Sequence, residues 1–294
     1  MPFLFALLLV FFGSQPKPAQ ASSGGSIPLF YQLIQAYKPA FSPSFANLTV
    51  ISSNINTSNS PVTISPPPNI GGGESGDLIT IAVLGDSMID TLGPNIPQLQ
   101  KALTQYYPHK KIKILNYGAS ATTIEYALFR LTNNYQYLGK TVPSLISQNP
   151  DVVVIESFAY NNFGNNQTGF DKQSGFLNNI ITTIHDKLPK ANILLTSTFA
   201  PNSLIFTNGS QNTPLNALEK VERTTTIKNY LENFITYAKN KHLPYADAYH
   251  PSLIQNEGNR DFINSKDNIH PSVYGGEFFC DTLAKALFDN HILP

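Results

Sequence analysis

Apolar residues along this chain gather in short runs that are separated by longer, helix-like stretches. The runs read LITIAVLG, KIKILNYG, DVVVIESF, NILLTSTF and the shorter LPYADAY, at residues 78–85, 111–118, 151–158, 192–199 and 243–249. The helix-like stretches between them lie at residues 95–106, 121–131, 171–188 and 215–241. Continuous apolar runs of this length are typical of strands buried on both faces, and their alternation with helices is typical of a parallel sheet. The pattern predicts an α/β fold: a three-layer α/β/α sandwich with a central, mainly parallel sheet of about five strands.

The chain ahead of these runs has a different pattern. An apolar run from Pro2 to Phe12 is too short to span a bilayer, and Ala19-Gln20-Ala21 has small residues where a secretory signal is cleaved. We therefore predict a signal peptide over 1–21 and a secreted or extracytoplasmic protein without a membrane span after cleavage. No Lys or Arg precedes the apolar run. An uncleaved N-terminus that anchors the protein, or a buried helix, therefore stays open as an alternative.

The segment that follows is rich in Ser, Pro, Gly and Asn, and it includes PPP at 66–68 and GGG at 71–73. Such a composition cannot bury enough apolar surface to offset the entropy lost on ordering. Residues 22–76 are therefore predicted to be a spacer with a short helix at 27–38. The folded domain is predicted to cover 77–294.

Composition narrows the choice of partner. Nineteen basic and nineteen acidic residues cancel, so no overall charge attracts nucleic acid or an anionic membrane, and a small or neutral partner is favoured. Cys280 is the only cysteine, which excludes disulfides within the chain and a zinc site built on several thiolates, and it is best interpreted as a buried thiol. The pattern leaves the oligomeric state undecided.

Candidate chemistry lies just after the predicted strands, where parallel sheets bind their ligands. The first strand is followed by LGDSMID, which places Ser87 in a turn that leads into a helix. The second is followed by NYGASATT, where Gly118 can approach a ligand closely and donate its N–H. The third is followed by ESFAYNN, where the amide of Asn161 or Asn162 can be a further donor.

Two histidines follow an aspartate at the same spacing. Asp267 and His270 stand in DNIHP, and Asp247 and His250 stand in DAYHP. A carboxylate that orients an imidazole makes it a competent general base. The remaining histidines are best interpreted as solvated surface residues: His109, His185, His242 and His291. None of the six has HxH or HExxH spacing, so the sequence predicts no metal site, and no cofactor is expected.

These blocks, taken in order, resemble the SGNH, or GDSL-type, serine hydrolase family of esterases and lipases, which has a flavodoxin-like fold. The resemblance spans about residues 78–290 and rests on LGDSM, NYGAS, ESFAYNN and DNIHP. It implies that Ser87 is the nucleophile, His270 its base and Asp267 the residue that orients the base. It also implies an oxyanion hole made by the N–H groups of Ser87 and Gly118 and by an asparagine side chain.

The third block departs from the family's Gly-x-Asn-Asp pattern. Phe158 or Ala159, depending on the register, stands at the glycine position, and Asn161-Asn162 replaces Asn-Asp. Asn161 is assigned as the donor, and a shift of one residue would make it Asn162.

The placement of the two Asp-x-x-His copies favours one of them. Asp267 and His270 directly precede the last predicted helix, as in the family, so His270 is preferred over His250 as the base. The predicted function is an exported serine esterase that removes short acyl groups, such as acetyl, from carbohydrate esters or other small esters. Two alternatives use the same fold: a binding module without activity and a carbohydrate O-acyltransferase.

Overall fold

The computed structural model describes residues 78–209 and 215–294. The predicted signal peptide (1–21), the spacer (22–76) and the short helix within it (27–38) lie outside these residues. Over the part of the chain that is described, no helix is both long enough and apolar enough to cross a bilayer.

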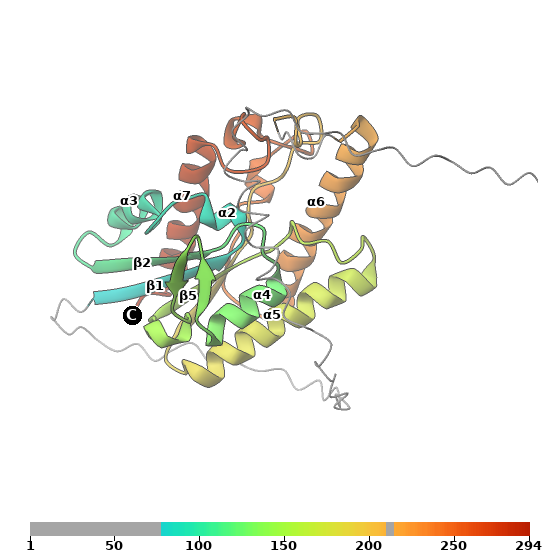
Figure 1. The fold of residues 1–294 in the computed structure, drawn as a ribbon. Coiled ribbons are helices and arrows are strands. Elements are labelled where there is room, and N and C mark those ends of the chain that lie inside the picture. Colours follow the sequence, from blue (N-terminus) through green and yellow to red (C-terminus); the bar gives the residue numbers. More distant parts are fainter. Residues whose placement is uncertain (1–77, 210–214) are drawn as a thin grey trace, which may run out of the picture. The chain divides into compact units, whose positions relative to one another are not determined.

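A single parallel sheet forms the centre of the domain (Figure 1). Its strands lie in the order β2-β1-β5-β6-β7: β1 (Leu78–Gly85), β2 (Lys111–Gly118), β5 (Val152–Glu156), β6 (Asn192–Thr196) and β7 (Tyr245–Ala246). The five strands coincide with the five apolar runs, so the predicted α/β fold is confirmed.

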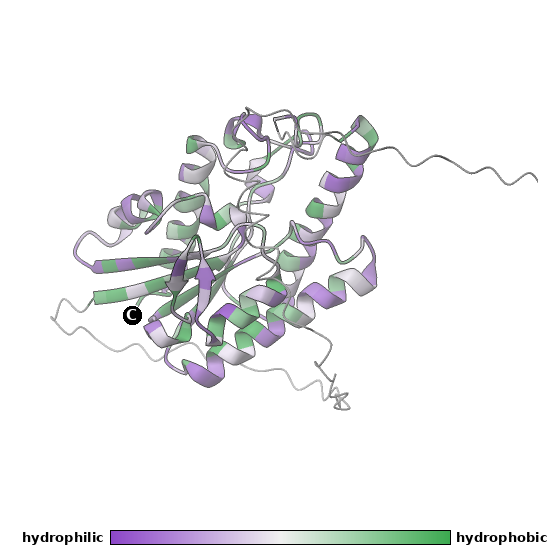
Figure 2. Cartoon of the chain, viewed as in Figure 1, coloured by the Kyte–Doolittle hydropathy of each residue, from purple (hydrophilic) through white to green (hydrophobic). Residues whose placement is uncertain are grey.

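Helices cover both faces of the sheet (Figure 1). One face packs against α3 (Pro97–Tyr106) and α7 (Val273–Asp289). The other packs against α4 (Ile124–Thr132), α5 (Gln167–Lys187) and α6 (Ala217–Asn240). Each strand supplies both cores by alternation: in β1, Ile81 and Val83 face α3 and α7, whereas Ala82 and Leu84 face the other three helices. In Figure 2 the central strands are mostly green, whereas the helices carry purple and green residues in alternation.

Side-chain caps determine where the helices begin. Thr123 accepts a hydrogen bond from Tyr126 N, so α4 begins at Ile124 rather than at the predicted residue 121. Asn166 caps α5 in the same way, which moves its start to Gln167 from the predicted residue 171. Asn216 and Glu219 form a reciprocal capping box at the start of α6.

Several short elements were not predicted. They are the one-turn helix α2 (Ser87–Asp90), the hairpin β3 (Tyr135–Tyr137) and β4 (Lys140–Val142), the hairpin β8 (Leu253–Ile254) and β9 (Glu257–Gly258), and the 3-10 turns Ile146–Gln148, His250–Ser252 and Arg260–Phe262. All lie between the main elements and leave the order of the sheet unchanged.

The strand order creates a crevice at one edge of the sheet. The chain moves from β1 outward to β2 and then returns to β5 on the other side of β1, so β1 and β5 flank a topological switch point. Gly85 pairs with Gly118, and Leu84 pairs with Ile155, so the ends of β1, β2 and β5 lie together. The three predicted strand-end blocks therefore meet at this edge.

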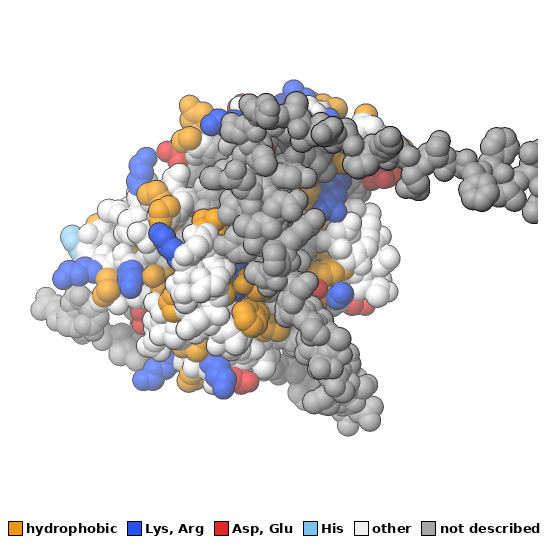
Figure 3. All heavy atoms as spheres, viewed as in Figure 1, with side chains coloured by type: hydrophobic (Ala, Val, Ile, Leu, Met, Phe, Trp, Pro, Cys, Tyr) orange, Lys and Arg blue, Asp and Glu red, His pale blue; other side chains and the backbone are white. Residues whose placement is uncertain are grey.

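Charged side chains of both signs are scattered over the face shown in Figure 3. This distribution agrees with the balanced composition of the chain.

Candidate active site

Ser87 is the first residue of α2, directly after β1. Asp86 caps this short helix, because its Oδ1 accepts a hydrogen bond from Met88 N at 2.9 Å. Ser87 is half-buried, and its own N–H has no hydrogen-bond partner among the residues that the structure describes. The turn therefore presents a hydroxyl and a free backbone donor at the same residue.

Gly118 allows α2 to lie close to the end of β2. A Cβ atom on Gly118 would come within 2.2 Å of Asp90 N, so any side chain there would displace the helix that carries Ser87. The Gly118 N–H itself donates to Asn116 Oδ1 at 2.7 Å. The structure thus shows a packing role for Gly118, and its N–H can reach an oxyanion only if Asn116 releases it.

Asp267 and His270 lie in the loop before α7 and are hydrogen-bonded to each other. Nδ1 of His270 lies 2.9 Å from Asp267 Oδ2, while Asp267 Oδ1 accepts from the N–H groups of Ile269 and His270. Burial alone would raise the pKa of the Asp267 carboxyl. The hydrogen bonds from the His270 ring and from the two backbone N–H groups outweigh burial and hold the pKa below its ordinary value. Asp267 is therefore ionised and holds Nδ1–H, which leaves Nε2 of His270 to accept a proton.

The structure places Ser87 and His270 at the same end of the sheet without a hydrogen bond between them. The charge of His270 acts on Asp86, the neighbour of Ser87, and lowers its pKa against the larger effect of burial. Among the described residues, no hydrogen bond joins the Ser87 hydroxyl to His270 or to His250. Hydrogen bonds of this kind often tighten only when substrate binds.

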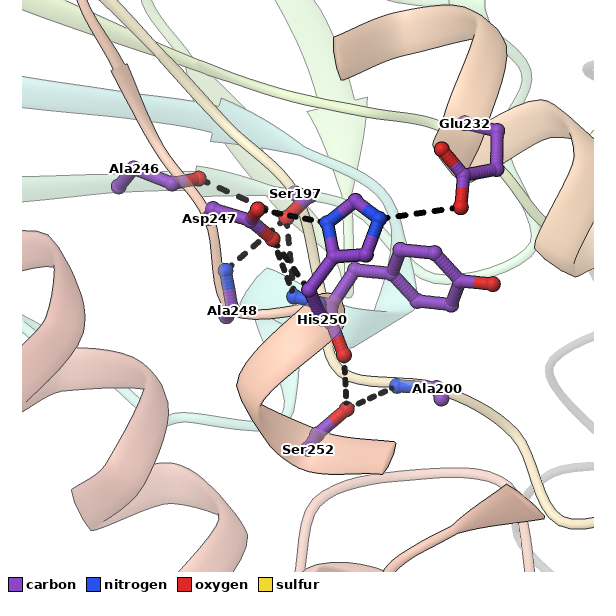
Figure 4. A network of polar contacts seen from close by, with 9 residues as sticks. Ser197, Ala200, Glu232, Ala246, Asp247, Ala248, His250 and Ser252 are labelled. Atoms are coloured by element: carbon purple, nitrogen blue, oxygen red, sulfur yellow. Dashed lines mark hydrogen bonds and ion pairs between the residues drawn. The ribbon is translucent and has the colours of Figure 1, made fainter. Parts of the chain in front are cut away.

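His250 is held by its aspartate in the same way as His270, but its ring also contacts a second carboxylate (Figure 4). Its Nδ1 lies 2.7 Å from Asp247 Oδ2, and Asp247 Oδ1 accepts from the backbone N–H groups of Tyr249 and His250. Its Nε2, however, lies 3.1 Å from Glu232 Oε1 on α6. Both ring nitrogens are thus occupied by carboxylates, and His250 links α6 to the segment after β7.

Asn161 and Asn162 are held in different ways. Asn161 is half-buried, and its Oδ1 accepts from Ile124 N at 2.7 Å, which leaves its Nδ2 without a partner among the described residues. Asn162 is exposed, and its Oδ1 accepts from Gly164 N within its own turn. Of the two amides, that of Asn161 is the better anchored donor, and its role in an oxyanion hole stays a prediction.

The backbone settles which residue of this block takes the glycine-like conformation. Phe158 is fully buried and has a φ of 51°, a left-handed value that glycine adopts most readily. With Phe158 at the glycine position of Gly-x-Asn-Asp, the asparagine position falls on Tyr160 and the aspartate position on Asn161.

Comparisons with known proteins agree with this geometry. Residues 83–277 match the model of the GDSL-like Lipase/Acylhydrolase family. The chain belongs to this family. It is therefore a hydrolase that acts on ester bonds, and the predicted family is confirmed. The comparison with curated protein sequences gave no match.

Solved structures of GDSL-like proteins resemble the fold. A GDSL-like lipase from Parabacteroides merdae is 13% identical with a TM-score of 0.52, over 72% of this chain and 96% of that one. A GDSL-like lipase from Bacteroides thetaiotaomicron is 17% identical with a TM-score of 0.49, over 71% of this chain and 88% of that one. A mutant acetyl-xylooligosaccharide esterase from Geobacillus is 18% identical with a TM-score of 0.47, over 72% of this chain and 93% of that one.

Two buried carboxyls lie beneath the nucleophile turn of this GDSL-family chain. Burial raises the pKa of Asp86 to about 6, although the Met88 N–H and the charges of His270 and Arg130 act against it. Burial and the charge of Asp86 raise the pKa of Glu156 well above its ordinary value. Glu156 Oε1 accepts from Ser157 Oγ and Phe158 N, and Oε2 accepts from Asp86 N. Through these three hydrogen bonds Glu156 joins the end of β5 to the Ser87 turn.

The raised pKa of Asp86 predicts how stability depends on pH. The unfolded carboxyl has a pKa of about 3.9, so between about pH 4 and 6 the native state holds a proton that the unfolded state has lost. Its contribution is full below the unfolded value and is lost as the pH rises through the folded one. Asp86→Asn keeps an acceptor for Met88 N but cannot ionise. We expect wild type to lose about 3 kcal/mol of unfolding free energy relative to Asp86→Asn between pH 4 and 7, measured by urea unfolding. A constant difference between the two proteins would contradict the prediction.

A cavity of about 600 Å³ adjoins the last loop. Ile269, the neighbour of His270, lines it together with Thr207. Its remaining wall comes mainly from the start of α6, where Glu219, Glu222 and Arg223 supply charged groups.

Sequence reasoning missed two groups near the nucleophile. Ala121 has a left-handed φ of 57°, is exposed, and has an N–H without a partner among the described residues. Its donor belongs to the backbone, so no side chain signals it. Tyr160 is the second group. It stands between Ala159 and Asn161, and an aromatic side chain in the sequence suggests packing rather than an oxyanion donor.

The predicted buried thiol of Cys280 is confirmed, since its side chain is inaccessible within the α7 core.

Proposed function

We propose that this GDSL-family hydrolase is an exported serine esterase that removes short acyl groups, acetyl above all, from carbohydrate esters. The observation that carries the catalytic part is the Asp267–His270 pair: Nδ1 of His270 is held by Asp267, and its Nε2 has no hydrogen-bond partner among the described residues. The charge of His270 acts on Asp86, the residue before Ser87. His250, the other candidate base, has its Nε2 on Glu232.

The reaction has two halves. Ser87 Oγ attacks the acyl carbonyl carbon and its proton passes to Nε2 of His270, while Asp267 stabilises the imidazolium. The tetrahedral intermediate collapses, the alcohol leaves with the proton from His270, and an acyl-serine remains. Water then attacks the acyl-serine with His270 again as base, which releases the carboxylic acid and restores Ser87.

The oxyanion of each tetrahedral intermediate needs donors close to Ser87. The Ser87 N–H and the Asn161 amide are two of them, and each contributes on the order of 3 kcal/mol to the transition state. The turn after β2 supplies the third donor, a backbone N–H. It is either that of Gly118 once Asn116 releases it or that of Ala121, which has no partner among the described residues.

The substrate proposal rests on the cavity next to His270. Asn162, Thr207, Glu219, Glu222 and Arg223 offer hydrogen-bonding groups of both kinds. A hydroxyl-rich alcohol such as a sugar suits these groups better than an acyl chain of many carbons does. Export rests on the apolar run and on the Ala19-Gln20-Ala21 pattern.

The test is hydrolysis of p-nitrophenyl acetate and of an acetylated xylo-oligosaccharide by the full chain beside Ser87→Ala. We expect turnover of both esters by wild type only, with acetyl esters faster than octanoyl esters. Turnover equal in the two proteins would refute the serine mechanism. Acetyl appearing on an added, unacetylated sugar instead of as acetate would show the transferase.

A further inference from the structure

The Tyr160 hydroxyl is a buried hydrogen-bond donor that the fold does not use. Its oxygen is inaccessible and has no partner among the described residues. Buried tyrosine hydroxyls nearly always find a partner, because desolvation without one is costly. A donor left open in this way points to a group that arrives with a ligand.

Tyr160 lies between the nucleophile turn and the loop of the base. Its ring packs against a small apolar cluster that contains Met88, the residue after Ser87, and Ile263 from the segment before the last loop. It also lines the cavity together with Ile269, the residue before His270. The backbone is fixed from the other side, where Arg223 on α6 donates to Tyr160 O.

The electrostatic surroundings agree with this position. Burial, followed by the charges of Asp86, Glu156 and Asp267, raises the pKa of Tyr160 above its ordinary value. The hydroxyl therefore keeps its proton throughout the neutral and mildly alkaline range, and it stays able to donate a hydrogen bond.

We propose that the Tyr160 hydroxyl donates a hydrogen bond to the oxyanion that forms when Ser87 attacks the ester carbonyl. The proton stays on Tyr160, so no bond to it forms or breaks. The proposal rests on the esterase function proposed above and adds a side-chain donor to that site. The proposal also agrees with the register of the third block. With the left-handed Phe158 at the glycine position of Gly-x-Asn-Asp, Tyr160 stands at the asparagine position, which supplies a donor in the family pattern.

The test is Tyr160→Phe in the full chain, assayed with p-nitrophenyl acetate. This change keeps the ring and its packing and removes only the hydroxyl. We expect kcat to fall about 100-fold with KM changed less than threefold, because the hydrogen bond is made only in the transition state. We also expect the thermal midpoint to stay the same or to rise, because the lost hydroxyl has no partner in the free protein.

Tyr237→Phe is the matched control. This tyrosine lies on α6 about 21 Å along the helix axis from Arg223, and its hydroxyl has no hydrogen-bond partner among the described residues. Its loss should change neither kcat nor KM. Ser87→Ala is assayed beside both variants.

The outcomes separate the two proposals. Turnover that depends on Ser87, together with a Tyr160→Phe kcat within twofold of wild type or a loss confined to KM, would overturn the Tyr160 role and leave the esterase standing. Absence of Ser87-dependent turnover would overturn both.

Discussion

Replacing His270 by alanine is expected to lower kcat for an acetyl ester on the order of 10⁴-fold, with KM changed little. The physical reason is that the Ser87 hydroxyl is a poor nucleophile until an imidazole takes its proton. Of the two Asp-x-x-His copies, only His270 has an Nε2 that no carboxylate occupies. The measurement is steady-state hydrolysis of p-nitrophenyl acetate at saturating substrate.

His250→Ala is the matched control for this prediction. His250 makes the same bond to its aspartate, and its side chain is 43% exposed. We expect kcat to be unchanged and the unfolding free energy to fall by about 1 kcal/mol or less, as for other exposed ion pairs. A large loss of kcat in His250→Ala with activity retained in His270→Ala would reverse the assignment.

Replacing Arg130 by alanine is expected to be the most destabilising single change, at about 3–5 kcal/mol of unfolding free energy. Arg130 is fully buried, and its guanidinium donates to Tyr117 O at 2.6 Å and to Gly85 O at 2.9 Å. These carbonyls stand at the ends of β2 and β1, directly beneath the Ser87 turn. Alanine would remove the guanidinium donors from both carbonyls, so that Gly85 O keeps only its bond from Ala119 N. It would also open a cavity between the rings of Tyr126 and Tyr135.

Urea unfolding measures the effect, with Arg260→Ala as the control. Arg260 is exposed, and its side chain makes no hydrogen bond or ion pair among the described residues. Its loss should change the unfolding free energy by less than about 0.5 kcal/mol. Equal effects at the two arginines would contradict the proposed role of Arg130.

The sheet could be predicted from the sequence because its strands are buried on both faces. Runs such as VVVIE in β5, which is buried along its whole length, are typical of a central strand that helices cover on both faces. Helix starts were less predictable, because they depend on single caps such as Thr123 and Asn166. The hairpin β3–β4 carries no strong pattern, since most of its side chains are at least partly exposed and its turn at Leu138-Gly139 depends on left-handed backbone.

In the candidate site, too, local contacts could be predicted from the sequence, whereas contacts between distant elements could not. The bond between aspartate and histidine is local and forms in both Asp-x-x-His copies, so the spacing predicts it. What separates the copies is Glu232, which comes from a different element and which no local pattern brings to His250. The bond from Gly118 N to Asn116 and the open hydroxyl of Tyr160 likewise depend on how the ends of the strands pack together.

The most direct test of the central claim, that Ser87 is a nucleophile activated by His270, is covalent labelling with an activated alkyl phosphonate ester. The protein is treated with the probe, and the adduct is located by mass spectrometry of the intact chain and of its peptides. We predict one adduct, on Ser87, formed at wild-type rate in His250→Ala and at least about 100-fold more slowly in His270→Ala. An adduct on another residue, or labelling of Ser87 at the same rate in both histidine variants, would contradict the account.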